Sequence, residues 1–183
     1  DLTPEKDNLP FRAVAMTRSG QTIIPGGDDT FEVGDLAYVI SSQAGLKELY
    51  KHSGKQHFEI RNIMILGGSR IGIKTARQLG NQHYVKMIEI DKQKSFRLSS
   101  MLSNTLVING DGTNMELLKD EGLEKMDAFI AVTGNSDTNI LSCLLAKHLG
   151  VKRTIAEVEN MDYIHLAENI GVDTIINKKL ITA

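Results

Sequence analysis

The sequence predicts an α/β fold, a Rossmann-type doubly wound parallel sheet of six strands preceded by a small partial α+β domain. From residue 62 onward, short apolar runs alternate with stretches of helical spacing, and a glycine-rich turn directly follows the first run. Residues 9–41 differ, because their apolar runs are joined by tight turns. The first pattern is typical of βαβ units with helices on both faces of a sheet, and the second of antiparallel strands.

The first part of the chain predicts three strands and one helix. The strands are expected at 11–18, 21–24 and 36–41, separated by Ser19-Gly20 and by a loop with Pro, Gly and Asp, residue types that favour chain reversal. Residues 44–51 have apolar side chains at helical spacing. So short a segment buries too little to be stable alone, so we expect it to pack on something else or to be the remainder of a larger domain.

After a polar stretch at 52–61, read as a linker, six strands are expected to alternate with five helices. The helix at 137–149 illustrates the support, because Asn135, Ser136 or Asp137 can cap its start and Gly150 can end it. The elements expected in order are strand 62–66, helix 71–80, strand 84–90, helix 93–102, strand 105–109, helix 114–121, strand 128–132, helix 137–149, strand 153–158, helix 161–170 and strand 174–177.

Composition excludes several classes of function. The formal net charge of −2 is unlike the broad basic face that nucleic-acid binding requires. Apolar runs such as 62–66 and 127–132 fall far short of the roughly 20 residues of a membrane-spanning helix. The polar start of the chain, residues 1–10, shows no signal-peptide pattern and reads as a loop.

A metal site is not expected. The five histidines show no ligand-like spacing, and the single cysteine, Cys143, lies in an apolar run where a buried thiol in a reducing compartment is expected. The acidic loop 26–35 does not match the spacing of a calcium-binding loop, and its Asp and Gly residues are common turn residues.

The segment GGSRIG at 67–72 follows the first strand of the second part and opens its first helix. A strand that turns tightly into a helix directs backbone N–H groups and the positive end of the helix at one spot, where a pyrophosphate can bind. Gly67 is expected to make the turn, and Gly72 to allow close packing of the helix on the strand. Ser69 stands where the G-x-G-x-x-G pattern has its middle glycine, so its side chain either crowds a diphosphate or donates a hydrogen bond to it.

Glu89 is expected at the end of the second strand of this part, 22 residues after Gly67, where an acidic side chain accepts hydrogen bonds from ribose hydroxyls. A carboxylate there also repels a 2′-phosphate, which favours NAD-type over NADP-type ligands. Asp91 is a competing candidate, and it can equally be the N-cap of the next helix.

Two further turns are expected at the same edge of the sheet. Asp111 in GDGT follows the third strand and can meet an adenine or ribose edge, or it can belong to an ordinary helix cap. Thr133 and Gly134 follow the fourth strand, across the topological switch point where open α/β sheets bind ligands, although a plain turn is the alternative.

Taken in order, five motifs resemble one known family over residues 60–183. GGSRIG, KMIEIDK, VINGDGT, FIAVTGNSDTNILSCLLAKHLG and GVDTIINKKLITA are similar to the RCK_N (KTN) nucleotide-binding domain of Trk-type potassium-uptake regulatory proteins. Residues 9–41 are similar to the later part of the RCK_C domain that follows each such domain. The resemblance therefore implies the end of an RCK_C domain at 1–54 and an RCK_N domain at 60–183, an excised middle piece of a tandem two-repeat regulator.

The resemblance implies a regulatory role without catalytic residues. It implies a cytoplasmic subunit, peripheral at the inner face of the cell membrane, that forms a homo-oligomeric ring beneath a potassium-transporting membrane subunit and gates it through NAD(H) or ATP and ADP. In the family pattern, the ribose acid corresponds to Glu89, the adenine-side acid to Asp111, and the loop over the ligand to Thr133 and Gly134. The phosphate-facing turn corresponds to Gly67, Gly68, Ser69, Arg70, Ile71 and Gly72.

Two departures from the family pattern bear on affinity. Ser69 replaces a glycine, and Glu157 stands where the family often has a basic residue, so our hypothesis is that this repeat binds nucleotide weakly or with altered preference.

Two other functions share this fold. An NAD-dependent oxidoreductase would need a base and a place for substrate, yet no Tyr is followed by Lys at the fourth position after it. An S-adenosylmethionine-binding domain would also use a glycine turn and an acid after the second strand.

Overall fold

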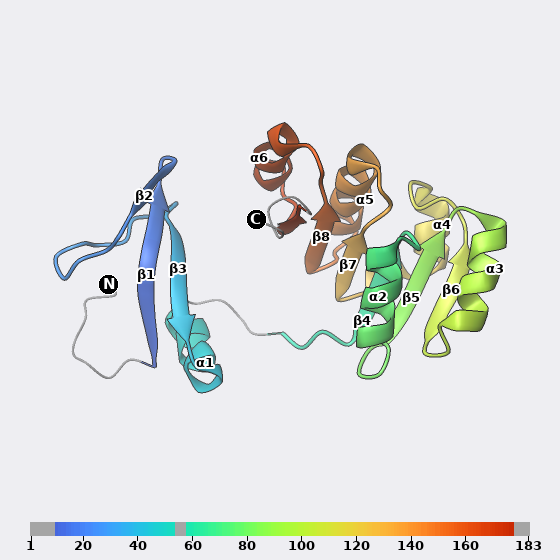
Figure 1. Ribbon diagram of the computed structural model, residues 1–183, viewed down its shortest axis with the longest axis horizontal. Helices are drawn as coiled ribbons and strands as arrows, with labels where there is room; N and C mark the ends of the chain where they lie inside the picture. The colour runs from blue at the N-terminus through green and yellow to red at the C-terminus, as the bar shows by residue number, and fades with distance from the viewer. Residues whose placement is uncertain (1–9, 54–57, 178–183) are drawn as a thin grey trace. The chain divides into compact units, whose positions relative to one another are not determined.

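A computed structural model of the chain describes residues 10–53 and 58–177 (Figure 1). The chain divides into two units, residues 1–58 and 59–183. The expectations for residues 1–9, for 54–57 within the linker and for the motif residues after 177 lie outside the described residues.

The N-terminal unit is a three-stranded antiparallel sheet in the order β2-β1-β3, followed by one helix. The turn between the first two strands places both Ser19 and Gly20 at positive φ, 49° and 80°, which suits a two-residue hairpin. Ser42 caps the helix, since its hydroxyl accepts a hydrogen bond from Gly45 N. The elements are β1 (Phe11–Arg18), β2 (Gln21–Ile23), β3 (Leu36–Ser41) and α1 (Gln43–His52).

The acidic loop of this unit is held by an arginine. Arg18 donates through Nε and Nη2 to the two carboxylate oxygens of Asp35, at 2.8 and 2.7 Å, and Nη1 lies 2.6 Å from Glu32 Oε1. The bidentate contact with the Arg18 guanidinium lowers the pKa of Asp35 to about 2. This pair ties the end of β1 to the start of β3.

The second unit is a six-stranded parallel sheet in the order β6-β5-β4-β7-β8-β9. The chain starts at the centre of the sheet, adds two strands on one side, and then returns to add three on the other. The switch point therefore lies between β4 and β7. The strands are β4 (Asn62–Leu66), β5 (Tyr84–Glu89), β6 (Thr105–Asn109), β7 (Ala128–Ala131), β8 (Arg153–Glu157) and β9 (Thr174–Ile176).

Helices cover both faces of this sheet (Figure 1). Side chains of α2 and α3 pack on one face, and those of α4, α5 and α6 pack on the other. A short 3-10 helix, η1, was not expected from the sequence. The helices are α2 (Arg70–Leu79), α3 (Lys92–Met101), α4 (Met115–Asp120), η1 (Leu123–Lys125), α5 (Ser136–His148) and α6 (Met161–Asn169).

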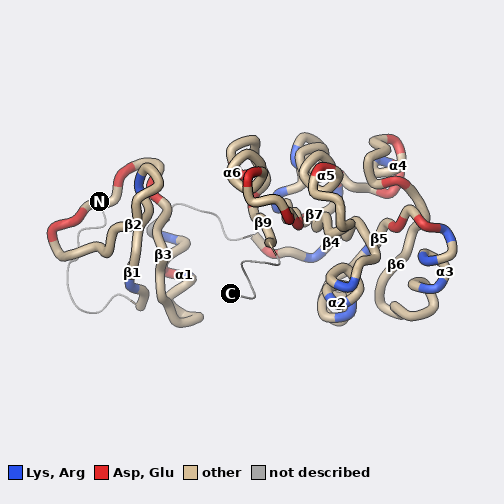
Figure 2. The backbone as a smooth tube through the Cα atoms, turned by 45° about the horizontal axis from the view of Figure 1, so that its top comes forward, with Lys and Arg blue, Asp and Glu red and all other residues tan. Residues whose placement is uncertain are grey.

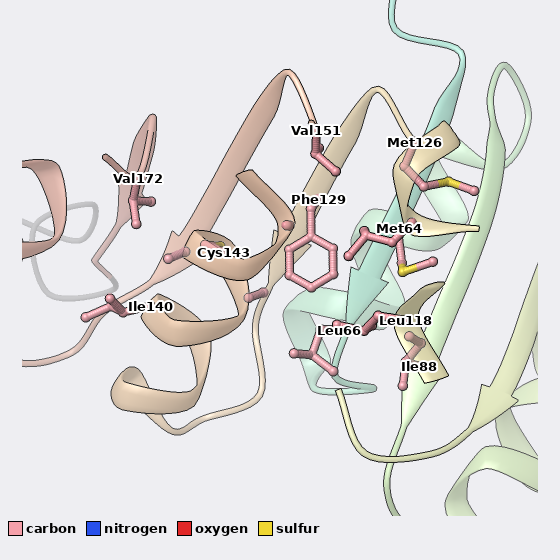
Figure 3. Close-up of a cluster of buried hydrophobic side chains, with 14 of the residues drawn as sticks. Met64, Leu66, Ile88, Leu118, Met126, Phe129, Ile140, Cys143, Val151 and Val172 are labelled. Carbon is pink, nitrogen blue, oxygen red and sulfur yellow. The ribbon is translucent and has the colours of Figure 1, made fainter. Parts of the chain in front are cut away.

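The core of the second unit is built by alternation along buried strands. In β4, Met64 joins the cluster on one face, whereas Ile65 joins the cluster on the other. Figure 3 shows Phe129 between Met64 and Cys143 in the first of these clusters. Burial raises the pKa of the Cys143 thiol to about 12, so it remains protonated, as expected of a buried small side chain.

Each α-helix of the second unit begins at an N-cap residue whose side chain accepts a backbone hydrogen bond. These residues are Ser, Asp or Asn, the types expected at helix starts. Asn135, one of three residues expected to cap α5, is its cap. Asp91 caps α3, as one of the two interpretations of this residue predicts. The cap of α4 is Asn114, so neither Asp111 nor Thr113 fills it. The remaining caps are Ser69 for α2 and Asn160 for α6.

Candidate functional site

A cavity of about 480 Å³ lies at the carboxyl end of the parallel sheet in the second unit. Four segments line it, namely the glycine turn after β4, the end of β5 with the first turn of α3, the turn after β6 and the loop after β7. The expected site residues that line the cavity are Gly67, Gly68, Ser69, Glu89, Asp111 and Thr133. Arg70, Ile71, Gly72 and Gly134 are not among its lining residues.

The glycines of the turn are required by close approach of the backbone. Gly67 has φ of 103°, and a Cβ there would lie 2.8 Å from the Cα of Thr133. A Cβ on Gly72 would lie 2.1 Å from the carbonyl oxygen of Gly67. The two glycines therefore perform the turn and the helix-to-strand packing that the motif predicts.

Ser69 turns its side chain back onto the helix. Its backbone is extended, with φ of −64° and ψ of 170°, so this position does not need glycine for its angles. Its hydroxyl accepts a hydrogen bond from Gly72 N at 3.2 Å. One of the helix N-terminal N–H groups is thus bonded within the protein and is not offered to a ligand.

Glu89 lies at the end of β5 and is only 5% exposed. Its Oε2 accepts from Gly68 N at 3.0 Å and lies 2.7 Å from Lys94 Nζ, while its Oε1 accepts from Asp91 N at 3.0 Å. Burial raises the pKa of Glu89, but the contacts with Lys94, Asp91 and Gly68 outweigh burial, and the net shift is downward. The side chain is therefore ionised at neutral pH.

Asp111 is held within its own turn. Its Oδ1 accepts from the backbone N and the hydroxyl of Thr113, at 2.9 and 2.8 Å. These bonds lower the pKa of Asp111. Asp111 and Thr113 both line the cavity, after the end of β6.

Two buried polar residues of α5 hold the loops around the cavity, and sequence reasoning missed both. Asn139 Oδ1 accepts from Thr133 N at 3.0 Å and from the Thr133 hydroxyl at 2.8 Å, and its Nδ2 donates to Glu157 O at 2.8 Å. Ser142 donates to Gly112 O at 3.2 Å. The structure buries both residues completely, and a polar residue among the buried positions of a helix is the signal that could have identified them.

The structure also adds cavity residues that the sequence did not single out. Lys94 and the largely exposed Ile90 come from the end of β5 and the start of α3, and Asn135 and Thr138 come from the start of α5. Glu157 is 1% exposed at the end of β8 and does not line the cavity. The departure from the family pattern expected at Glu157 therefore does not lie in the cavity wall.

The cavity offers backbone N–H groups, carboxylates, hydroxyls and one ammonium group, a set suited to a polar ligand rich in hydroxyls. Within residues 10–53 and 58–177, no cluster of three or more His, Cys, Asp and Glu could hold a metal ion. In the same ranges, no helix is long and apolar enough to cross a bilayer.

The family model described as the TrkA-N domain matches residues 63–178. The chain belongs to this family. The fold prediction is confirmed as well, since the six-stranded parallel sheet with its flanking helices follows a small antiparallel sheet.

Relatives of this TrkA-N chain extend well beyond it. It is 34% identical over 167 residues to the Trk system potassium uptake protein TrkA homolog 2 of Methanosarcina mazei. The match covers 90% of this chain and 37% of the relative. It is 32% identical over 184 residues to the Trk system potassium uptake protein TrkA of Vibrio alginolyticus, covering 99% of this chain and 40% of the relative. The chain thus spans less than half of the length of these relatives.

Solved structures share the fold. The GsuK RCK domain has a TM-score of 0.62 at 20% identity, over 92% of this chain and 36% of that one. The GsuK channel bound to NAD has a TM-score of 0.61 at 20% identity, over 92% and 30%. The TrkA-N domain of the inner membrane protein ybaL from Escherichia coli has a TM-score of 0.61 at 15% identity, over 69% and 93%.

Proposed function

We propose that this chain is a nucleotide-sensing regulatory part of a Trk-type potassium uptake system and that its ligand is NAD(H), or ATP and ADP. The observation that carries the proposal is the cavity at the switch point of a TrkA-N sheet, where the glycine turn faces the carboxylate of Glu89. Parallel sheets bind nucleotides in this position. Neighbours in fold have been solved with NAD and with ADP, both as GsuK.

The residues present fit an adenine nucleotide. The turn at Gly67 and Gly68 has no side chain over the start of α2, and a Cβ on Gly68 would lie 2.4 Å from Leu98 Cδ1. A diphosphate would lie against this turn, the adjoining ribose would donate to Glu89, and the adenine would lie toward Asp111. Thr133 and Gly134 would form the loop over the ligand. Because Ser69 uses Gly72 N–H, we expect modest affinity.

Arg70, Ile71 and Gly72 act in this proposal through the helix and not as walls of the cavity. They form the first turn of α2, and their backbone sets the direction in which the N–H groups point. Gly72 keeps that turn against Gly67.

A regulatory role is supported over a catalytic one by the chemistry of the cavity wall. Its described residues include no His, Cys or Tyr, and the one Lys is paired with Glu89. Tyr84 begins β5, at the end of the sheet away from the cavity. A ligand here would instead change the loops held by α5, through Asn139 and Ser142.

The wider assembly follows from the same proposal. Tyr163 and Leu166 of α6 and Ile170, its C-cap, form an exposed apolar stripe at helical spacing, which suits contact with a second copy in a ring. Residues 1–54 would be the later part of an RCK_C domain, ahead of the nucleotide-binding domain at 60–183. The ring would lie in the cytoplasm, against a potassium-transporting membrane subunit.

Calorimetric titration of the full 183-residue chain with NAD, NADH, ADP, ATP and S-adenosylmethionine tests the proposal. We expect adenine nucleotides with a diphosphate to bind, and Glu89→Gln to weaken NADH binding by about tenfold, because a charge-assisted hydrogen bond to the ribose is lost. Glu124→Gln, on the exposed surface of η1, is the matched control and should change nothing. Binding of S-adenosylmethionine alone would contradict the proposal.

A further inference from the structure

Lys94 lines the cavity beside both the glycine turn and Glu89. Its Nζ lies 2.7 Å from Glu89 Oε2, and a Cβ on Gly68 would lie 3.4 Å from its Cε. The Lys94 side chain is 38% exposed, whereas the Glu89 side chain is 6% exposed. Lys94 is therefore the more exposed member of this ion pair.

Lys94 is the one cation among the described residues that line the cavity (its helix, α3, is seen in Figure 2). The carboxylates that line the same cavity are those of Glu89 and Asp111. Asp91, the nearest other acid in sequence, caps α3 through Lys94 N and is not part of the wall. Glu89, the acid expected to bind the ribose, is thus already in an ion pair with Lys94 when a ligand arrives.

The carboxylate of Glu89 has few acceptor positions left. Its two oxygens accept about four hydrogen bonds in total, and three are taken, by Gly68 N and Lys94 Nζ at Oε2 and by Asp91 N at Oε1. A ribose with both hydroxyls free donates twice, so its second hydroxyl competes with Lys94. A ribose phosphorylated at the 2′ position donates once and brings an anion that the ammonium group can contact.

We propose that Lys94 lets this site accept 2′-phosphorylated adenine dinucleotides, NADP(H), alongside NAD(H). The inference rests on the proposed function, because it concerns the ligand of the same cavity. A bare carboxylate at the end of the second strand repels a 2′-phosphate, but here the Lys94 ammonium offsets that charge. The flexible stem and three donors of a lysine allow it to contact a carboxylate and a phosphate together.

The test is a titration of the full chain with NADH and with NADPH, for the wild type and three variants. The wild type should bind the two dinucleotides within about tenfold of each other. Lys94→Met should weaken the binding of NADPH by about tenfold, since one charged contact to phosphate is lost. It should change the affinity for NADH by less than about threefold. Glu89→Gln should shift the preference the other way, toward NADPH. Lys92→Met, an exposed lysine of the same helix turn, is the control and should leave both affinities unchanged.

The outcomes separate this inference from the function on which it rests. NADH binding with a NADPH-to-NADH ratio that Lys94→Met leaves unchanged would overturn the inference alone. A wild type that binds NADH more than about tenfold tighter than NADPH would also overturn the inference alone. A wild type that binds neither dinucleotide, nor ADP, would overturn both.

Discussion

Among residues 10–53, the N-terminal unit buries one apolar side chain, Met16, whereas the strand β4 of the second unit alone buries Ile63, Met64, Ile65 and Leu66. Each unit nevertheless contains a cavity of about 480 Å³. The first cavity is walled largely by apolar side chains, and the second by the ends of parallel strands and the polar groups beyond them. Buried strands therefore support the second cavity, whereas the first lies in a unit whose described residues bury little apolar surface.

The same contrast appears on the surface of the strands. Leu36, Tyr38 and Ile40 occupy alternate positions of β3 and are all exposed, so the described residues of the N-terminal unit do not cover one face of its sheet. In the second unit, helices cover both faces. Four changes test this difference between the two units.

The largest effect is expected for Phe129→Ala. Phe129 is completely buried at the centre of the second unit (Figure 3), so its removal should lower the free energy of unfolding by about 3–5 kcal/mol. Tyr38→Ala, on the exposed face of β3, should cost less than about 0.5 kcal/mol. Urea unfolding followed by circular dichroism measures both changes. Equal losses would mean that the two units are stabilised alike.

The next effect is expected for Gly72→Ala. Its added Cβ would lie 2.1 Å from a backbone carbonyl oxygen, which cannot move aside as a flexible side chain can, so we expect a loss of about 3 kcal/mol. Gly27→Ala is the matched control in the N-terminal unit, where a Cβ meets nothing within 4 Å. Thermal unfolding of the two variants should differ clearly. Similar midpoints would show that α2 does not depend on close packing at this turn.

Asn139→Ala should cost about 2 kcal/mol, because Thr133 N and Glu157 O would lose their buried partner. Asn81→Ala removes an exposed hydrogen bond to Asn104 and should be close to neutral. Asn139→Ala should also weaken NADH binding, since the loop after β7 would no longer be fixed. A stable variant with unchanged NADH affinity would show that α5 does not position this loop.

These variants also show what the sequence could predict. The strands and helices follow from periodicity and caps within one or two residues, because those signals are local. The helix η1 is too short for any periodicity, and it escaped prediction for that reason. The turn at Gly67 and the close packing at Gly72 were predicted, since the motif encodes a close approach of backbone atoms.

Contacts between side chains of different elements could not be predicted. The ion pair of Glu89 with Lys94 depends on the direction of a long side chain from the first turn of α3, which spacing does not reveal. The place of Arg70, Ile71 and Gly134 outside the cavity wall depends on how each turn is oriented. Asn139 was overlooked because a polar residue in a helix is usually exposed, whereas this one is buried.

The smallest effect is expected from pH in the N-terminal unit. The pKa of Asp35 is lowered from 3.8 to about 2 by Arg18, so the contact stabilises the loop above about pH 4 and is lost as the pH falls through about 2. In Arg18→Met, the Asp35 carboxyl should titrate near its ordinary value, whereas Arg12→Met should leave it unchanged. Carboxyl carbon shifts measured by NMR report this titration directly. An Asp35 midpoint that is the same in all three proteins would contradict the assignment.

We propose above that a nucleotide binds where the glycine turn faces Glu89. Amide chemical shifts of the isotope-labelled chain, recorded while NADH is added, test it most directly. We expect the amides of Gly68, Ser69 and Ile90 to shift together and saturably, while those of β9, at the far edge of the sheet, stay in place. Saturable shifts confined to other parts of the chain, with the glycine turn unchanged, would contradict it.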